Sequence, residues 1–134
     1  AKYISKVAKW LHDGPFNKSD AHPLRHRYIY LKVFKNKREQ IVRVDLTTLL
    51  YIENEKNYLT LHLDNEKIII RHTLQGILPE LNQYFIRIHK SYIINIDRIQ
   101  FIEKAAVVLD NHLKVPLSAR HRSRLLDTIQ KFRS

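Results

Sequence analysis

The sequence predicts a mainly β domain with two short helices, preceded by a further helix and a linker. From residue 28 onward, short runs of β-branched, aromatic and leucine residues alternate with polar turn signals, as expected for consecutive strands. Within this part, a helical period replaces the strand pattern only in residues 73–83 and 118–132. The segment before residue 28 differs from both patterns, because residues 12–27 mix Gly, two Pro and three His.

The N-terminal segment is predicted to hold one amphipathic helix and a linker. Residues 1–11 carry apolar side chains at helical spacing, and Asp13-Gly14-Pro15 ends that pattern because Gly leaves a helix easily and Pro cannot continue one. We therefore divide the chain into a helix and linker, residues 1–27, and a domain, residues 28–134. The first part fits either the end of a preceding domain or an ordinary N-terminal arm.

The first half of the domain is predicted to form antiparallel strands. Asn57–Leu63 is the most regular, with leucine at every second position and Tyr, Thr and His between them. Since the chain has two glycines, its turns are expected to depend on Asn and Asp, which tolerate left-handed backbone. The strands expected here are Tyr28–Lys35, Gln40–Val44, Thr48–Glu53, Asn57–Leu63 and Lys67–Arg71.

The second half combines both periods. Thr73–Gln83 reads as a helix with Thr73 as its N-cap, shortened or kinked by Pro79. Ser118 is expected to cap a last helix that reaches Phe132. Between the helices lie three predicted strands, the last of them closed by Pro116: Arg98–Glu103, Ala105–Leu109 and His112–Val115. The apolar stripe of the last helix is Leu125, Ile129 and Phe132.

Residues 87–95 join the two patterns and hold a dense set of donors beside apolar residues. The sequence here is RIHKSYIIN, in which Ile88, Tyr92, Ile93 and Ile94 favour a core and the other five side chains carry donors. A tight turn between two core strands, with its polar tip in solvent, satisfies both requirements. Such a tip suits an anion, although a solvated basic turn has the same residues.

Charge narrows the class of partner. The chain has 24 Lys and Arg against 13 Asp and Glu, a net charge of +11 and a pI near 10.0. Residues 1–38 hold ten basic and two acidic residues, residues 39–85 hold four and seven, and residues 86–134 hold ten and four. This excess favours a polyanion or an anionic membrane surface. No apolar run of eighteen residues spans a bilayer, and the absence of cysteine excludes disulfides and thiolate chemistry.

The last helix concentrates cations where a helix tolerates them least. Arg120, Arg122 and Arg124 lie in its first two turns, beside the partial positive charge of the N-terminus, where each cation costs about 0.3–1 kcal/mol. A bound phosphate reverses the sign of this effect. The alternative is an exposed helix whose arginines are hydrated.

No pattern indicates an enzyme, a metal site or a cofactor. Four carboxylates flank one predicted hairpin and could hold Mg²⁺, although such residues usually serve solvation; they are Glu53, Glu55, Asp64 and Glu66. His22 and His26 lack an obvious third zinc ligand. The sequence contains neither a glycine-rich phosphate loop nor an arrangement typical of a catalytic nucleophile.

Three segments together resemble the signature blocks of the LytTR DNA-binding domain family. They are IENEKNYL at 52–59, FIRIHKSYIIN at 85–95 and VPLSARH at 115–121, and the likeness extends over about residues 38–132. The middle block is the most specific. The resemblance implies an elongated arrangement of small antiparallel sheets that binds double-stranded DNA through loops. Two loops would enter successive major grooves, and a third would meet the intervening minor groove.

The resemblance also implies roles for individual residues. Asn57, Lys90 and Arg120 would contact bases, one from each block. Phosphate or supporting contacts would come from Lys56, Tyr58, His89, Ser91, His121 and Arg124. Family members often have a basic residue where Ala119 stands, so this loop would hold fewer phosphate contacts, and the residue at position 57 varies within the family.

The family usually forms the output domain of a bacterial two-component response regulator, behind a receiver domain, and binds direct repeats in promoters. We accordingly expect a cytoplasmic transcription regulator, with residues 1–27 ending or following such a receiver domain. Three alternatives stay open. One is a non-specific or RNA-binding module that stacks bases on Tyr51, Tyr58, Tyr84 and Tyr92. The others are a metal-dependent nuclease and, least favoured, a membrane-surface protein.

Overall fold

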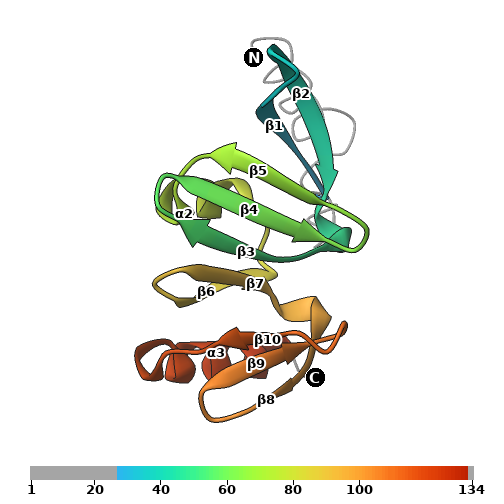
Figure 1. Ribbon diagram of the computed structural model, residues 1–134. Coiled ribbons are helices and arrows are strands. Elements are labelled where there is room, and N and C mark those ends of the chain that lie inside the picture. Colours follow the sequence, from blue (N-terminus) through green and yellow to red (C-terminus); the bar gives the residue numbers. More distant parts are fainter. Residues whose placement is uncertain (1–26, 133–134) are drawn as a thin grey trace.

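Three small antiparallel sheets are stacked one above another in the computed structural model, which describes residues 27–132 (Figure 1). The upper sheet is β1-β2, the central sheet has the order β5-β4-β3-β7-β6, and the lower sheet has the order β10-β9-β8. The predicted fold class is therefore confirmed: mainly β, elongated, with small antiparallel sheets and helices α2 and α3. The predicted N-terminal helix over residues 1–11, and the linker up to residue 26, lie outside the described residues.

The upper sheet is a two-stranded hairpin of β1 (Tyr28–Lys35) and β2 (Arg38–Asp45). Strand β1 has the predicted bounds, whereas β2 is longer than the predicted Gln40–Val44. The turn between them places Asn36 and Lys37 in the left-handed region, with φ of 54° and 62°. Two consecutive residues with positive φ match the twist of the flanking strands. The expectation that Asn and Asp would make the turns is thus only partly met.

The central sheet contains two hairpins, whose adjacent strands β3 and β7 pair with each other. Its strands are β3 (Leu49–Glu55), β4 (Tyr58–Leu63), β5 (Lys67–Arg71), β6 (Phe85–His89) and β7 (Tyr92–Asn95). The predicted strand Thr48–Glu53 was wrong at its start, because a 3₁₀ turn, η2 (Leu46–Thr48), precedes β3. The Asp45 carboxylate holds this turn by accepting hydrogen bonds from the backbone N–H and hydroxyl of Thr47, at 3.0 and 2.7 Å.

The helix predicted over Thr73–Gln83 is much shorter than expected. It consists of α2 (Leu74–Ile77) followed by a 3₁₀ turn, η3 (Leu78–Glu80). Thr73 is confirmed as the N-cap, since its hydroxyl accepts from the Gly76 N–H at 2.9 Å. Pro79 lacks the N–H that would continue an α-helical ladder, which accounts for the change to 3₁₀ geometry.

The remaining elements form the lower sheet and the long helix. They are η4 (Ile96–Arg98), β8 (Ile99–Ile102), β9 (Ala106–Leu109), β10 (Lys114–Pro116) and α3 (Ala119–Phe132). The predicted strand His112–Val115 was wrong at its start, because His112 has φ of 66° and lies in the β9–β10 turn. Pro116 belongs to β10 instead of closing it. This is tolerated because β10 is an edge strand, where no neighbour requires its missing N–H.

The middle strands of the central sheet, β3 and β7, are buried on both faces, in two separate cores. Leu49 and Ile52 of β3, with Ile93 of β7, pack against the upper hairpin and α2. Leu50 of β3 and Ile94 of β7 pack against the lower sheet and Leu125 of α3. The predicted apolar stripe of α3 is only partly buried, because Ile129 is half-buried and Phe132 is exposed while stacking on Tyr84.

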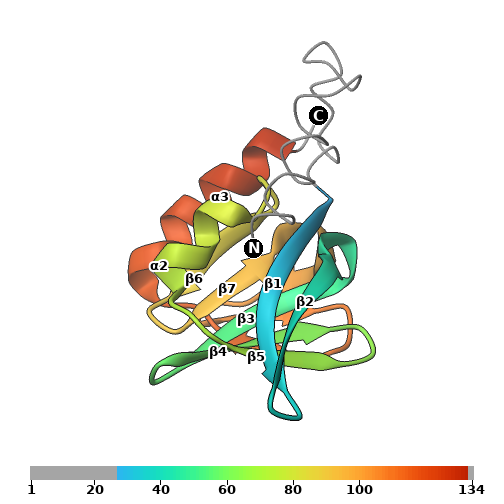
Figure 2. The ribbon, with the colours of Figure 1, turned by 90° about the horizontal axis from the view of Figure 1, so that it is seen from above.

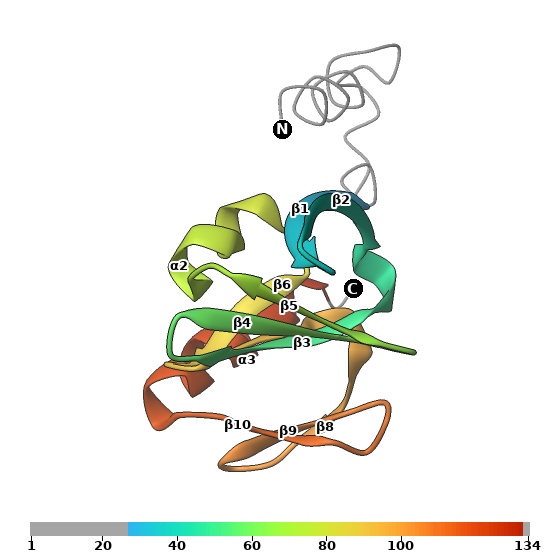
Figure 3. The ribbon, with the colours of Figure 1, turned by 45° about the horizontal axis from the view of Figure 1, so that its top comes forward.

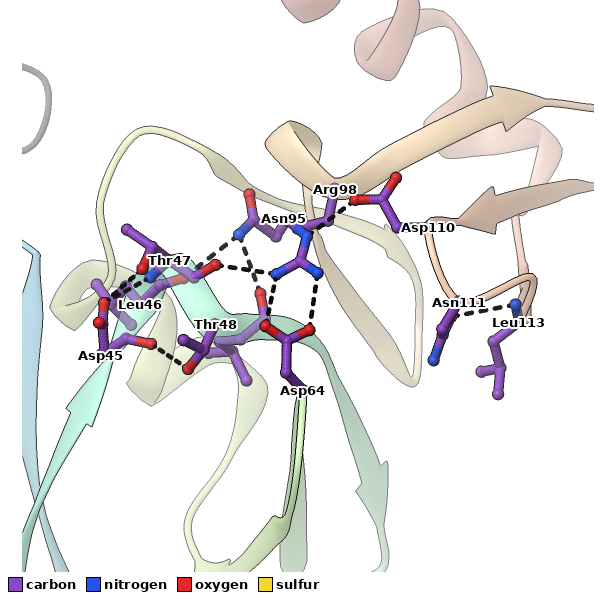
Figure 4. Close-up of polar contacts among 11 residues, drawn as sticks. Asp45, Leu46, Thr47, Thr48, Asp64, Asn95, Arg98, Asp110, Asn111 and Leu113 are labelled. Carbon is purple, nitrogen blue, oxygen red and sulfur yellow. Dashed lines mark hydrogen bonds and ion pairs between the residues drawn. The ribbon is translucent and has the colours of Figure 1, made fainter.

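Asn95 and Arg98 join the layers at one end of the molecule (Figure 4). Asn95 is 2% exposed; its amide Nδ2 donates to the Leu49 carbonyl at 2.9 Å, and its Oδ1 accepts from the Asp97 N–H at 2.9 Å. The Arg98 guanidinium donates to both carboxylate oxygens of Asp64, at 2.7 and 3.1 Å, and to Asp110 at 2.9 Å. These contacts raise the pKa of Arg98 and connect η4 to the β4–β5 and β9–β10 turns.

Replacing Asn95 by Ala is expected to lower the free energy of unfolding by about 1–3 kcal/mol, because the Leu49 carbonyl and the Asp97 N–H would lose a buried partner. Urea unfolding followed by circular dichroism measures this change. Asn111→Ala is the matched control, since Asn111 caps an exposed turn by accepting from Leu113. Equal losses in both variants would contradict the role assigned to Asn95.

Candidate nucleic-acid interface

Three donor-rich segments lie along one edge of the molecule. These are the β3–β4 turn, the β6–β7 turn and the first turn of α3, and all three are on the left in Figures 1, 2 and 3. In Figure 1 they follow one another from the central sheet down to the lower layer. We call this row of three segments the donor edge. The connection from β7 to β8, which contains η4, is on the opposite side in Figure 1, so the ion pairs of Arg98 lie away from the donor edge.

Backbone hydrogen bonds fix the spacing of the three segments. The Asn54 N–H donates to the Ser91 carbonyl at 2.8 Å, which ties the end of β3 to the β6–β7 turn. The Ser118 N–H donates to the Ile88 carbonyl at 3.0 Å, which ties the start of α3 to β6. The donor edge is therefore one hydrogen-bonded unit. The sequence carries no signal for these contacts, because any residue except proline supplies a backbone N–H.

The β3–β4 turn exposes the first set of predicted site residues. Strand β3 runs to Glu55, and the turn itself is Lys56-Asn57, with Lys56 at φ of 58°. Both turn residues are exposed, as is Tyr58 (49%) at the start of β4. The structure thus presents the side chain predicted to contact a base and the two predicted to support it.

The β6–β7 turn exposes the side chain of Lys90, and hydrogen bonds hold the backbone of the turn in place. The Arg87 guanidinium donates to the carbonyls of His89 and Lys90, at 3.3 and 2.7 Å. The Ser91 N–H donates to Nδ1 of His89 at 3.1 Å. Because Nδ1 is the acceptor, a neutral His89 ring carries its proton on Nε2.

Two donors expected in this turn therefore serve other purposes. Arg87 is engaged with the carbonyls of its own turn, and Asn95 is buried and binds η2, β3 and η4. The expectation that residues 87–95 offer five donors to a ligand was wrong for these two side chains. Their direction depends on strand register and burial, neither of which is visible in the composition of the segment.

The start of α3 provides the third set. Arg120 and Arg124 are exposed, and their four-residue spacing places them on one side of the helix. Ser118 directly precedes the helix, as predicted, but its hydroxyl bonds Nδ1 of the His121 ring at 2.6 Å, and the His121 N–H donates to the Ser118 carbonyl at 3.0 Å. Arg122 is half-buried on the side of buried Leu125, with its Nε without a hydrogen-bond partner among the described residues. The arginine cluster is thus divided between two sides of the helix.

Several cations of the donor edge lie close to His121. Partial burial is the largest cause that lowers the pKa of His121 from its ordinary 6.5, followed by repulsion from Arg120, Arg87, Arg124 and His89. Arg120 and Arg124 belong to α3, whereas Arg87 and His89 belong to β6, which the Ser118 N–H holds beside the start of α3. Within the described residues, Lys56, Lys90, Arg120 and Arg124 make no ion pair with a carboxylate.

A row of contacting side chains runs across the central sheet and joins the β3–β4 hairpin to the β6–β7 hairpin. The Glu53 carboxylate accepts from the Tyr92 hydroxyl at 3.2 Å and lies 3.3 Å from Nε2 of His62. The His62 ring stacks on Tyr51 at 4.1 Å between centroids, and the His89 ring meets Tyr92 edge-on at 5.5 Å. The row connects β4, β3, β7 and β6. Burial dominates the raised pKa of Tyr51, about 12, and the lowered pKa of His62, so both side chains are held in their neutral forms near pH 7.

The carboxylates considered for a metal site are separated by the fold. Glu53 lies opposite Thr60 of β4 and is engaged by His62 and Tyr92, whereas Asp64, just after β4, is paired with Arg98. The four residue steps from Thr60 to Asp64 span about 13 Å of extended strand. In the described part of the chain, no three His, Asp or Glu side chains are grouped as metal ligands.

The tyrosines considered for base stacking do not form one exposed surface. Tyr51 is buried against His62, Tyr84 stacks on Phe132, and Tyr92 is half-buried and bonded to Glu53. Tyr58 alone among the four is exposed. Within residues 27–132, no helix is long and apolar enough to cross a membrane.

The fold and the donor edge together define a domain of three stacked β-sheets, in which exposed cations lie in two turns and at the start of one helix. The chain belongs to the LytTr DNA-binding domain family, whose model matches residues 39–130. Among solved structures, it is similar to one described as the LytTr DNA-binding domain of a methyl-accepting/DNA response regulator from Bacillus cereus. That likeness has a TM-score of 0.64 and 21% identity, and covers 77% of this chain and 96% of the other. No curated protein sequence gives a significant match.

The crowding of cations around His121 predicts a measurable titration. We expect its ring to titrate below 6.5 in the free protein, and Arg120→Gln to raise its pKa by removing one repelling charge. A pH series of NMR spectra of the imidazole measures both values. Lys131→Gln, at the far end of the same helix, is the control and should leave the pKa of His121 unchanged. No change in Arg120→Gln would show that the two side chains are not close.

Proposed function

We propose that this domain binds double-stranded DNA sequence-specifically through the donor edge, as the output part of a bacterial transcription regulator. The observation that carries the proposal is the pair of backbone hydrogen bonds that hold three cation-bearing segments in one row. Phosphates favour such a row because each unpaired Lys or Arg that meets one releases a condensed counterion. Family membership supports DNA as the polyanion.

The roles of the segments differ by their chemistry. In this proposal the β3–β4 turn, with Asn57, and the start of α3, with Arg120, enter successive major grooves. An Asn side chain pairs with adenine and an Arg side chain with guanine through two hydrogen bonds each. Lys90 lies between them and meets the minor groove, where base patterns are less distinct, so it sets register more than sequence. His121 and Arg124 would bind phosphates beside Arg120, and Lys56, Tyr58, His89 and Ser91 would support the two turns.

The proposal includes a biological setting that follows from the family. We place the protein in the bacterial cytoplasm, downstream of a phosphorylated receiver domain in a two-component system, acting at promoter direct repeats. Residues 1–27 would belong to the connection between the two domains, and residues 28–134 to the DNA-binding domain. No cofactor and no catalytic step enter this function.

An RNA-binding or non-specific module is the second candidate, and the basic charge is equally compatible with it. The buried or bonded states of Tyr51, Tyr84 and Tyr92 argue against base stacking. Competition between labelled duplex and single-stranded RNA at matched salt separates the two, since preferential binding of RNA would overturn the proposal.

Arg120→Ala is expected to weaken binding to a selected duplex by about 1–3 kcal/mol and to relax preference at one base pair, because a bidentate base contact is lost. The duplex is first selected from a random pool by the unchanged protein. Gel-shift titrations then compare it with a scrambled duplex. An equal loss on both duplexes would remove the base-reading role of Arg120, whereas a selection without any preferred sequence would remove specificity itself.

Lys90→Gln is expected to weaken binding to both duplexes by similar factors and to reduce the slope of log affinity against log salt by about 1, since one phosphate or groove contact is lost. Affinities at four salt concentrations give the slope. Lys67→Gln is a suitable control, because Lys67 is exposed at the start of β5, at the end of that strand away from the donor edge. A slope unchanged in Lys90→Gln would place Lys90 away from the duplex.

A further inference from the structure

Strand β5 ends at the same edge as the three donor segments, and its last residue is Arg71. Figure 1 shows the arrowhead of β5 on the side of the β3–β4 turn. The strand register pairs Arg71 with Tyr58, the first residue after that turn. Since β5 lies beside β4 on the side away from β3, Arg71 stands one strand spacing, about 4.8 Å, beyond the β3–β4 hairpin. The donor edge thus continues past the first of its three segments.

The face on which Arg71 lies is open. Ile70 is buried in the upper core, whereas Ile69 is 60% exposed on the opposite face of β5. Side chains alternate along a strand, so Arg71 shares the open face with Ile69, and it shares that face with Tyr58 across the strand pair. Arg71 is exposed, and its guanidinium makes no hydrogen bond or ion pair with another described residue.

The nearest carboxylate in the same row does not reach Arg71. The register across three strands is Glu55, Tyr58 and Arg71, so the tyrosine stands between the carboxylate and the guanidinium. Other cations are neutralised by a neighbour, such as Arg98 by Asp64 and Arg27 by Asp45. Arg71 instead resembles Lys90 and Arg120, which are unpaired and exposed.

We propose that Arg71 adds a fourth segment to the donor edge, binding a phosphate on the backbone that borders the groove entered by the β3–β4 turn. A guanidinium one strand beyond a turn that enters a groove lies where the flanking sugar–phosphate backbone passes. Its planar fork suits phosphate oxygens. The contact adds affinity and register without reading a base. The inference rests on the proposed function.

The test uses Arg71→Gln and a control from the same strand. Lys67 begins β5 at the opposite end and is also exposed, so Lys67→Gln removes the same charge from the same sheet, away from the donor edge. The probes are a duplex selected from a random pool by the unchanged protein and its scrambled counterpart. Affinity is measured at four salt concentrations.

We expect Arg71→Gln to weaken binding to both duplexes by roughly fivefold to tenfold at 0.1 M salt, and to lower the salt slope by about 1. Arg71→Lys should keep the slope, and Lys67→Gln should stay within twofold of the unchanged protein. Equal behaviour of Arg71→Gln and Lys67→Gln, while Arg120→Ala still weakens selected binding, would overturn the contact and leave the proposed function standing. Failure of the unchanged protein to bind either duplex would overturn both.

Discussion

Burial of β3 and β7 on both faces of the central sheet is the constraint on which the rest of the structure depends. Ile93 and Ile94 are consecutive in β7, yet they enter different cores. In β3 a register shift between Leu49 and Tyr51 directs Leu50 and Tyr51 to the same side. These two central strands therefore require a layer above and a layer below, and their hairpin turns can project only at the sheet's ends. The stack and the donor edge both follow from this.

Much of this fold is predictable because strand alternation is a local signal. Strands β1 and β5 have the predicted bounds, and the tight turn expected within residues 87–95 is present. Prediction was poorest where a proline, or a residue with positive φ, determined the local backbone conformation. Pro79 shortened one helix, and His112 adopted positive φ in a turn where Asp and Asn were expected to suffice.

The candidate site was predictable in its residue types but not in its connections. Exposure of Asn57, Lys90 and Arg120 agrees with their polar surroundings in the sequence. The direction of Arg87, the burial of Asn95 and the position of Arg71 beside Tyr58 all depend on register between distant strands. Hydrogen bonds between backbone groups cannot be predicted from the types of the residues that make them. A sequence can therefore name the donors of a site without showing which of them face outward.

The two backbone hydrogen bonds along the donor edge hold its three segments at fixed distances from one another. Their partners are atoms of paired strands and a helix start, so the distances between the three segments cannot adjust independently. A double helix that contacts all three segments would therefore have to change its own shape, by bending or by changing groove width. The energy of that deformation depends on base steps that no side chain touches. A stiff protein edge would in this way extend sequence preference into the untouched part of its binding site.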